Sequence, residues 1–382
     1  MQTEQLTWVA GGGWQSSGAV LADAQLVLYF GSSDALITDT WYPELRIRYP
    51  DAHIVGCTSG GQIQHAGVTE TGIVAMAVRF AATPLRIATE AVADPGHSRA
   101  HGATLGSKLA ADDLVGVFVL SDGLNVNGSE LIRGLLSALG KSVRISGGLA
   151  GDGARFAHTR VGADGLPQAK TLAAIGFYGS AVRFNCGSGG GWETFGVPRR
   201  VTHSSGRELF ELDGKPALDL YERYLGDEAE GLPGTALLYP LKIWDPERPS
   251  HDVVRTVLAV NRTTRSMTFA GDIPRGSKAQ LMRGEFNRLA AGATEAASQA
   301  ISGQREGIAG GGLALLVSCI GRRLLMGQRI EDEIEAVAEV FPARVAQMGF
   351  YSYGEIAPHA VSQVCELHNQ TMAITVISEV AP

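Results

Sequence analysis

Three short glycine-rich segments constrain the fold of this chain more than any other feature of its sequence. They read GCTSGGQI (56–63), SGGLAGDG (146–153) and GFYSYGEI (349–356). Each segment is preceded by an apolar run that ends in small polar residues, and each is followed by a second apolar run. Such self-similarity indicates one structural unit used repeatedly. The chain is therefore expected to contain the same small unit three times.

The apolar runs predict the strands of this unit. They are rich in Val, Leu and Phe and lack polar alternation, which is typical of strands buried on both faces. The upstream runs are LVLYFGSS (26–33), LVGVFVLSDG (114–123) and LALLVSCIG (313–321). The downstream runs are IVAMAVRF (73–80), TLAAIGFYG (171–179) and TMAITVIS (371–378).

Helical periodicity lies between each upstream run and its glycine-rich segment. It is clear in 130–140 and 330–341 and weaker in 41–50, which contains Pro43 and ends at Pro50. Further helical segments, 98–113 and 284–301, precede the second and third units. The order helix, strand, helix, strand, hairpin, strand predicts an α/β fold with mixed sheets covered by helices.

The region 187–276 has a different pattern. The segments 199–214 and 253–271 each predict a hairpin around a polar turn, and 213–226 predicts a helix with Asp213 as N-cap and Gly226 as C-cap. We therefore expect two modules. The first, 20–200, holds two repeat units, and the second, 201–380, holds the hairpins and the third unit.

Composition excludes several classes of protein. The chain has 382 residues, 45% hydrophobic and 19% charged, with a formal charge of −7, which predicts a folded globular protein without a nucleic-acid surface. We expect no membrane association and a cytoplasmic location, because the start lacks a secretion signal and no apolar run is long enough to span a bilayer. The four cysteines show no CxxC spacing and are expected to be buried, reduced thiols.

Known catalytic and phosphate-binding patterns are absent from the sequence. GxGxxG, GxxxxGK[ST], GxSxG and HExxH do not occur. The glycine-rich segments are therefore interpreted as structural turns rather than phosphate loops. A hydrolase that uses Cys319 or a serine is kept as the less favoured alternative, since a thiol at the end of a buried strand is expected to be inert.

Candidate ligand-binding residues cluster near the ends of the predicted strands and in the turns beside them. Ligands of α/β proteins prefer the crevice outside the carboxyl ends of strands. Arg255 lies in the apolar run VVRTVLAV, where an inward side chain would need an anionic partner and an outward one would not. A cation, hydroxyls and a carboxylate together suit a zwitterion. The predicted set is Arg255, Cys319, Arg322, Ser352, Tyr353, Glu355 and Asn369.

Seven motifs in this order resemble the FIST family of sensory domains, with its N-terminal and C-terminal parts. They are the segments 56–63, 146–153, 213–226, 270–277 (AGDIPRGS), 318–322 (SCIGR), 349–356 and 368–372 (HNQTM), and the resemblance spans about 20–380. It implies a non-enzymatic sensor that binds a small ligand, with amino acids among the proposed ligands. A subgroup of the family comprises nitric-oxide-sensing haemoproteins that regulate a histidine kinase or a cyclic-di-GMP enzyme.

Two versions of this sensor therefore stay open. One binds haem b and senses nitric oxide, with His251, His368 and His203 as axial candidates that no motif separates. The other is a haem-free receptor for a small polar metabolite such as an amino acid. No kinase or cyclase pattern accompanies the two modules, so the signal is expected to pass to a separate protein such as a histidine kinase. A homodimer is the base-rate expectation.

Overall fold

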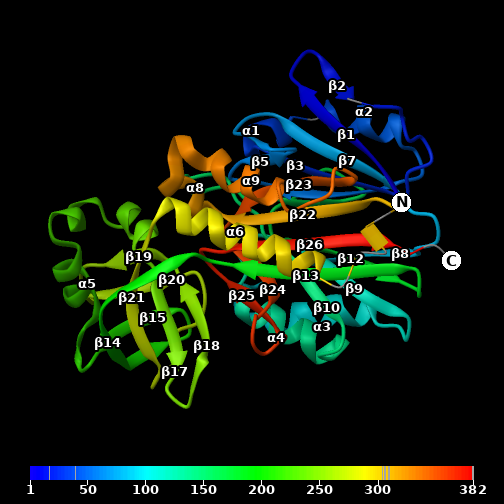
Figure 1. Cartoon of the computed structure of the whole chain (residues 1–382). Helices are drawn as coiled ribbons and strands as arrows, with labels where there is room; N and C mark the ends of the chain where they lie inside the picture. The colour runs from blue at the N-terminus through cyan, green and yellow to red at the C-terminus, as the bar shows by residue number, and fades with distance from the viewer. Residues whose placement is uncertain (17, 39, 303, 305–306, 309, 381–382) are drawn as a thin grey trace.

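The computed structural model of the chain describes residues 1–16, 18–38, 40–302, 304, 307–308 and 310–380. It is an α/β protein in which helices cover several mixed sheets, so the predicted fold class is confirmed. Three sheets of six strands form the body, and a fourth sheet of eight strands projects from it on the left of Figure 1. No helix within the described residues is long and apolar enough to cross a membrane.

The first sheet is built around the first repeat unit. Its strand β3 runs parallel to β4 and antiparallel to β7, and β11, β1 and β2 complete the order β11-β4-β3-β7-β1-β2. Helices α1 (Ser33–Leu36) and α2 (Trp41–Arg48) connect β3 to β4. The strands are β1 (Gln2–Val9), β2 (Gly13–Ser16), β3 (Leu26–Gly31), β4 (His53–Thr58), β7 (Ile73–Arg79) and β11 (Val161–Ala163).

The second sheet repeats the same core in the order β25-β24-β10-β9-β12-β8. Strand β9 is parallel to β10 and antiparallel to β12. The short helix η1 (Pro95–His97) leads into α3 (Ser98–Leu109), and α3 packs against α4 (Gly128–Leu139) on the outer face. The strands are β8 (Leu85–Ala91), β9 (Leu114–Ser121), β10 (Arg144–Leu149), β12 (Thr171–Tyr178), β24 (Gly354–Pro358) and β25 (Cys365–His368).

The third sheet has the order β13-β26-β22-β23-β5-β6, with β22 parallel to β23 and antiparallel to β26. Helix α6 (Phe286–Ile301) lies across β13 and β26. The helices α8 (Ile320–Met326), η4 (Gly327–Arg329) and α9 (Ile330–Ala338) connect β22 to β23. The strands are β5 (Gln62–Gln64), β6 (Gly67–Thr69), β13 (Val182–Gly189), β22 (Gly312–Cys319), β23 (Val345–Ser352) and β26 (Met372–Glu379).

The three sheets exchange the strands that follow their glycine-rich segments. Strands β5 and β6 follow the first segment but join β23 of the third sheet. Strand β11 follows the second segment and joins β4 of the first sheet. Strands β24 and β25 follow the third segment and join β10 of the second sheet. Each unit thus completes the sheet of another unit in a closed cycle, which the sequence did not predict.

Close approach of parallel strands explains why glycine recurs in these segments. A Cβ atom added to Gly56, Gly147 or Gly349 would lie 1.9 Å from a backbone carbonyl oxygen of the first strand of the same unit. Any side chain would therefore push apart β3 and β4, β9 and β10, or β22 and β23. The structural interpretation of the repeated glycines is confirmed at these three positions.

The ends of the three glycine-rich segments meet one another. The backbone N–H of Gly60 donates to the carbonyl of Tyr351 over 2.8 Å, and that of Gly151 donates to the carbonyl of Thr58 over 3.1 Å. Side chains from all three sheets also form one shared apolar core, in which the rings of Phe30 and Phe350 stack at 4.5 Å. The body is therefore one packed unit rather than three separate sheets.

The fourth sheet is organised around the long strand β14, which pairs with β21 over its first part and with β15 over its second. Helix α5 (Ala217–Leu225) packs against it through a separate apolar core. Two short helices, η2 (Gly226–Gly231) and η3 (Gly234–Leu238), follow α5. The strands are β14 (Trp192–Ser205), β15 (Glu208–Leu212), β16 (Lys215–Pro216), β17 (Leu241–Asp245), β18 (Arg248–Arg255), β19 (Val257–Asn261), β20 (Ser266–Phe269) and β21 (Lys278–Gly284).

Two local predictions for this region need correction. Asp213 is not the N-cap of α5, because the helix begins at Ala217 and Asp213 has a φ of 52°. Its carboxylate accepts a hydrogen bond from the backbone N–H of Arg200 at 2.8 Å instead. Gly226 is the C-cap, as predicted. The run VVRTVLAV is not one strand, since β18 ends at Arg255 and the chain then enters β19 to pair with β20.

The predicted modules, 20–200 and 201–380, remain a prediction about domain organisation. Strand β13 precedes that boundary yet pairs with β26 of the third sheet. Strand β14 crosses the boundary and belongs to the fourth sheet. Hydrogen bonding thus links segments from both sides of residue 200.

Candidate functional site

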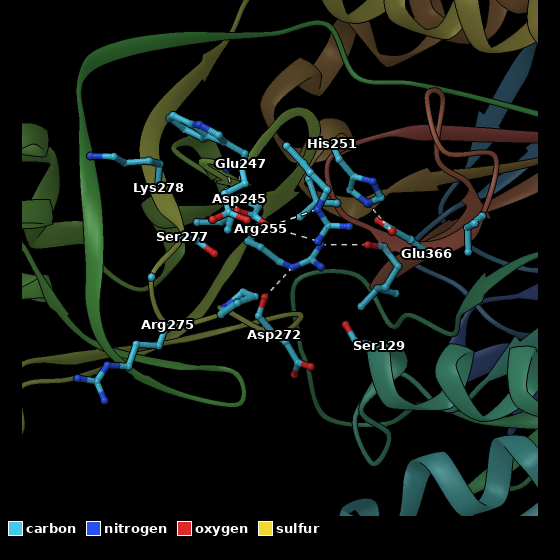
Figure 2. Close-up of a pocket in the computed structure, with 18 of the residues that line it drawn as sticks. Ser129, Asp245, Glu247, His251, Arg255, Asp272, Arg275, Ser277, Lys278 and Glu366 are labelled. Atoms are coloured by element: carbon cyan, nitrogen blue, oxygen red, sulfur yellow. Dashed lines mark hydrogen bonds and ion pairs between the residues drawn. The ribbon is translucent and has the colours of Figure 1, made fainter.

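A large cleft lies where the fourth sheet meets the body (Figure 2). Its volume is about 940 Å³. One wall is α4 and a second is β25. The rest comes from β17, β18, the loop between β20 and β21, and single residues of β14 and β21. The cleft is therefore formed by segments far apart in the sequence, which only the tertiary structure brings together.

Arg255 lies at the floor of this cleft, at the end of β18. Arg255 is 7% exposed to solvent. Nε donates to the carbonyl of Asp272 at 3.2 Å, and Nη1 donates to the carbonyls of Val254 at 3.1 Å and Leu367 at 3.0 Å. Nη2 has no hydrogen-bond partner in the part of the chain that the structure describes. The side chain thus points inward, and one edge of its guanidinium is free to bind another group.

Burial leaves the charge of Arg255 without a hydrogen-bonded counterion. Desolvation lowers the pKa of the guanidinium to about 10, although the carboxylates of Asp272 and Glu366 act in the opposite direction. Its hydrogen bonds within the described part of the chain all end on carbonyl oxygens. A buried cation of this kind is stabilised when an anion binds beside it.

Gly271 makes room for this guanidinium. A Cβ atom at Gly271 would lie 2.8 Å from Arg255 Nε and 3.0 Å from its Cζ. The loop that carries Gly271 also carries Asp272, whose carboxylate accepts from Arg133 at 2.9 Å and from the Asn127 amide at 3.2 Å. Asn127 is the N-cap of α4. The loop therefore connects the floor of the cleft to the helix opposite.

Ser129 brings a second unsatisfied polar group to the cleft. It lies in the first turn of α4 and is 9% exposed, and its Oγ atom has no hydrogen-bond partner among the described residues. Figure 2 shows its hydroxyl on the side of the cleft that faces Arg255. A buried hydroxyl without a partner costs stability, which is explained if a ligand supplies that partner.

Arg255 alone, of the seven predicted ligand residues, lines this cleft. Arg322 is a fully buried residue of α8, and its Nε and Nη2 donate to Glu333 at 2.9 and 2.6 Å. Its Nη2 also donates to the carbonyl of Leu289 at 2.8 Å. The structure therefore gives Arg322 an internal partner and no access to a cleft.

Glu355, Ser352 and Cys319 lie near Arg322 inside the body. The Glu355 carboxylate accepts from Ser352 Oγ at 2.6 Å and from Thr371 Oγ1 at 3.0 Å, and burial raises its pKa to about 8. Burial also raises the pKa of the Cys319 thiol, with the Glu355 carboxylate acting in the same direction. These groups satisfy one another and are not exposed to a ligand.

Tyr353 and Asn369 also lie in the interior. The Tyr353 hydroxyl donates to Asp152 and lies 2.9 Å from the carbonyl of Gly153, and its ring stacks on Phe156 at 4.4 Å. Asn369 is 1% exposed and donates from Nδ2 to the carbonyl of His368 at 2.9 Å. Tyr353 thus joins the second and third glycine-rich segments rather than forming a pocket wall.

The three histidines proposed as haem ligands occupy different surroundings. His251 lines the cleft, and its Nε2 lies 2.6 Å from Glu366 Oε1. His368 is buried with Nε2 at 3.1 Å from the carbonyl of Ala357, and burial lowers its pKa to about 3. His203 stacks on Phe210 in the β14–β15 hairpin. No metal-binding group of three or more His, Cys, Asp or Glu side chains occurs among the described residues.

Several cleft residues were not predicted from the sequence. Ser129, Arg200, Asp272, Arg275, Lys278 and Glu366 all line it. A signal for part of this set was present, because Asp272 and Arg275 lie in AGDIPRGS, one of the motifs behind the family resemblance. That motif had no role assigned, since nothing local shows that it faces α4.

Comparison with known proteins identifies the parts of the chain. Residues 25–215 match the FIST N domain and residues 217–358 match the FIST C domain. Comparison with curated proteins gives no match. Among solved structures, a cyanuric acid hydrolase from A. caulinodans aligns with 100% of this chain and 99% of its own, at 8% identity and a TM-score of 0.36. A second cyanuric acid hydrolase aligns over 99% of both chains at 10% identity and a TM-score of 0.32.

Proposed function

The chain belongs to the FIST family, and from that premise we propose that it is a non-enzymatic sensor whose cleft at Arg255 binds a small polar ligand. FIST domains are sensory domains that bind small ligands in signalling proteins. The observation that carries the proposal is the buried guanidinium of Arg255, which lines a cleft of about 940 Å³ and has a free Nη2. Ligand sites combine such a cavity with a few directed polar groups.

The position of the cleft supports a signalling role. Its α4 wall lies within the FIST N match, whereas β17, β18 and the 270–277 loop lie within the FIST C match. A ligand there contacts both parts of the chain at once. Binding then favours whichever relative arrangement gives the better contacts, and a partner protein can respond to that arrangement. A separate histidine kinase or cyclic-di-GMP enzyme is the proposed recipient, and a homodimer is the proposed oligomeric state.

The hydrolase alternative has little support from the candidate nucleophile. Cys319 is 3% exposed, and burial raises the pKa of its thiol, so the reactive thiolate is disfavoured. A preparation that hydrolyses a substrate and loses this activity on Cys319→Ala would contradict the sensor proposal. We expect the Cys319→Ala protein to retain its ligand binding.

Haem is the second candidate ligand, and the position of His251 in the cleft favours it. Of the three candidate imidazoles it alone lines the cleft, and its ring stacks on His359 at 4.3 Å. A bound haem would supply an iron that takes nitric oxide. The residues fit this group poorly, because Glu366 occupies His251 Nε2 at 2.6 Å and the cleft is lined by many charged side chains. A polar ligand fits the same lining better.

Two measurements separate these proposals. An absorption spectrum after haem reconstitution shows a Soret band that shifts with nitric oxide and is lost in His251→Ala if haem is the ligand. A thermal-shift screen of polar metabolites, amino acids included, shows stabilisation by mass action if a metabolite binds. Arg255→Lys keeps the charge but removes Nη2, and it should abolish that stabilisation. Lys215→Gln, at an exposed position outside the cleft, should not.

A further inference from the structure

The charges that line the cleft are not balanced. Six Arg and Lys side chains line it against four carboxylates, while the whole chain has a formal charge of −7. Three of the four carboxylates already have a cationic partner in the lining. Asp272 pairs with Arg133, Asp245 with Arg248, and Glu366 with His251 when that imidazole is protonated. The excess of positive charge is therefore local to this cleft.

The unpaired cations lie at the outer rim. The charged groups of Arg200, Arg275 and Lys278 have no carboxylate within 4.0 Å in the described part of the chain, and the charge of Lys278 acts at longer range on the carboxylate of Asp213. Arg200 of β14 and Lys278 of β21 are direct partners across an antiparallel pair of strands. Like charges in that position repel each other, and an anion between or beside them removes the penalty. Figure 2 shows Arg275 and Lys278 across the cleft from His251 and Glu366.

The same charges argue against a zwitterion. The ammonium group of an amino acid would need a carboxylate that is free to accept it. Of the four lining carboxylates, Asp245 and Asp272 pair with arginines and Glu366 lies 2.6 Å from His251 Nε2, which leaves only Glu247 without a partner among the described residues, exposed in the turn between β17 and β18. An anionic group, in contrast, meets the free Nη2 of Arg255 and the unpartnered hydroxyl of Ser129 at the floor.

We infer that the cleft binds a small molecule with at least two negative charges. One anionic group, a phosphoryl group or a carboxylate, takes hydrogen bonds from Arg255 Nη2 and Ser129 Oγ. The remaining negative charge lies toward Arg200, Arg275 and Lys278, which also attract the ligand from solution. The inference rests on the proposed ligand-binding function and names the chemical class of the ligand.

The test is calorimetric titration of the purified chain with four probes. Inorganic pyrophosphate and citrate carry several negative charges and represent the phosphoryl and carboxylate sources, and glycine and alanine are net-neutral zwitterions. We expect pyrophosphate or citrate to bind, with an affinity that falls as salt is raised, and the zwitterions to bind at least about tenfold more weakly.

Variants then locate the site. Arg255→Lys should weaken binding of the anion at least about tenfold, because a hydrogen bond to a charged group is lost. Arg275→Gln should weaken it a few-fold and reduce its dependence on salt, and Lys215→Gln is the matched control with no effect.

Ser129→Ala should weaken binding while leaving the stability of the ligand-free protein unchanged or raised, since a buried unpartnered hydroxyl is removed. A purely structural role for Ser129 would give the opposite change in stability.

The outcomes distinguish this inference from the proposed function. Tighter binding of glycine or alanine, lost in Arg255→Lys, would overturn the polyanion inference and leave the sensor site in place. Anion binding that is unaffected by Arg255→Lys and Ser129→Ala would also overturn the inference, because the anion would lie elsewhere. Failure of these probes and of the wider metabolite screen to bind at Arg255 would overturn both.

Discussion

Two buried arginines of this molecule have opposite surroundings. Arg322 lies inside the three-sheet body and has no solvent exposure, and its guanidinium forms an ion pair with the equally buried Glu333 at 2.6 Å. Arg255 lies in the cleft beside the fourth sheet, and its hydrogen bonds end on carbonyl oxygens. A buried cation that is neutralised in place holds the fold together. One that lacks a hydrogen-bonded counterion is available to a ligand.

The contrast extends to the regions around them. In the body, Glu333 also accepts from Ser318 at 2.8 Å and from Tyr351 at 3.2 Å, so one carboxylate satisfies several groups. In the cleft, Ser129 Oγ has no partner among the described residues, and Arg200 faces Lys278. The cluster around Glu333 pairs its polar groups with one another, whereas the cleft leaves the hydroxyl of Ser129 open. Changes in the body should therefore alter stability, and changes in the cleft should alter binding.

The largest effect is expected from Glu333→Ala. It leaves the Arg322 charge buried without its counterion, which should destabilise the protein by about 3–5 kcal/mol. Urea unfolding measures this change. The matched control is Glu193→Ala, which breaks exposed ion pairs with Arg283 and Arg288 and should cost less than about 1 kcal/mol. Equal losses in the two variants would break the contrast between the regions.

A smaller loss is expected from Gly349→Ala. The new Cβ would lie 1.9 Å from the carbonyl of Leu316 and would force β22 and β23 apart, at a cost of about 1–3 kcal/mol. Gly56→Ala should behave alike, because the same contact recurs with β3. Gly165→Ala is the control, since a Cβ there meets no atom within 4 Å. Thermal unfolding that fails to separate these variants would contradict the role given to the repeated glycines.

Two buried groups of the body predict how stability depends on pH. The pKa of Glu355 is raised from 4.5 to about 8, so its contribution to stability is present below pH 4.5 and is lost as the pH rises through 8. The pKa of His368 is lowered from 6.5 to about 3, so its contribution is present above pH 6.5 and is lost as the pH falls through 3. Between pH 4.5 and 6.5 the two slopes oppose each other.

Above pH 6.5, of these two groups only Glu355 therefore changes the free energy of unfolding with pH. It should lower stability by on the order of 1 kcal/mol per pH unit up to pH 8. Melting temperatures measured from pH 6.5 to 8 should fall in the unaltered protein and stay flatter in Glu355→Gln, which retains hydrogen-bonding ability without a titrating group. An identical fall in both proteins would show that another group is responsible.

The smallest effect on stability is expected from Gly271→Ala. The new Cβ would lie 2.8 Å from Arg255 Nε and displace the guanidinium, which is the flexible end of a side chain. Stability should change by less than about 1 kcal/mol, while pyrophosphate or citrate should bind several-fold more weakly. A variant that loses stability but keeps its affinity would place Arg255 among the structural arginines, with Arg322.

Local sequence determined most of the secondary structure. The apolar runs of 26–33, 114–123 and 313–321 became β3, β9 and β22, and the repeated glycines became points of close strand approach. These results follow from short-range rules. A strand buried on both faces needs an apolar run, and a position where any Cβ atom would lie 1.9 Å from a neighbouring carbonyl oxygen needs glycine. Asp213 was misassigned because its carboxylate bonds to Arg200 on β14, a partner that no local pattern reveals.

Only the tertiary structure decided which strands complete which sheet and which arginine is free. An edge strand such as β5 offers the same backbone groups to any partner, so its pairing with β23 depends on how the three units pack. Arg255 and Arg322 were equal candidates in the sequence. They differ because the connection after β22 places the Glu333 carboxylate beside Arg322. At Arg255 only the backbone carbonyl of Asp272 accepts a hydrogen bond, because the Asp272 carboxylate pairs with Arg133. Charge neutralisation depends on distances of a few ångströms between distant parts of the chain, which the order of residues alone does not fix.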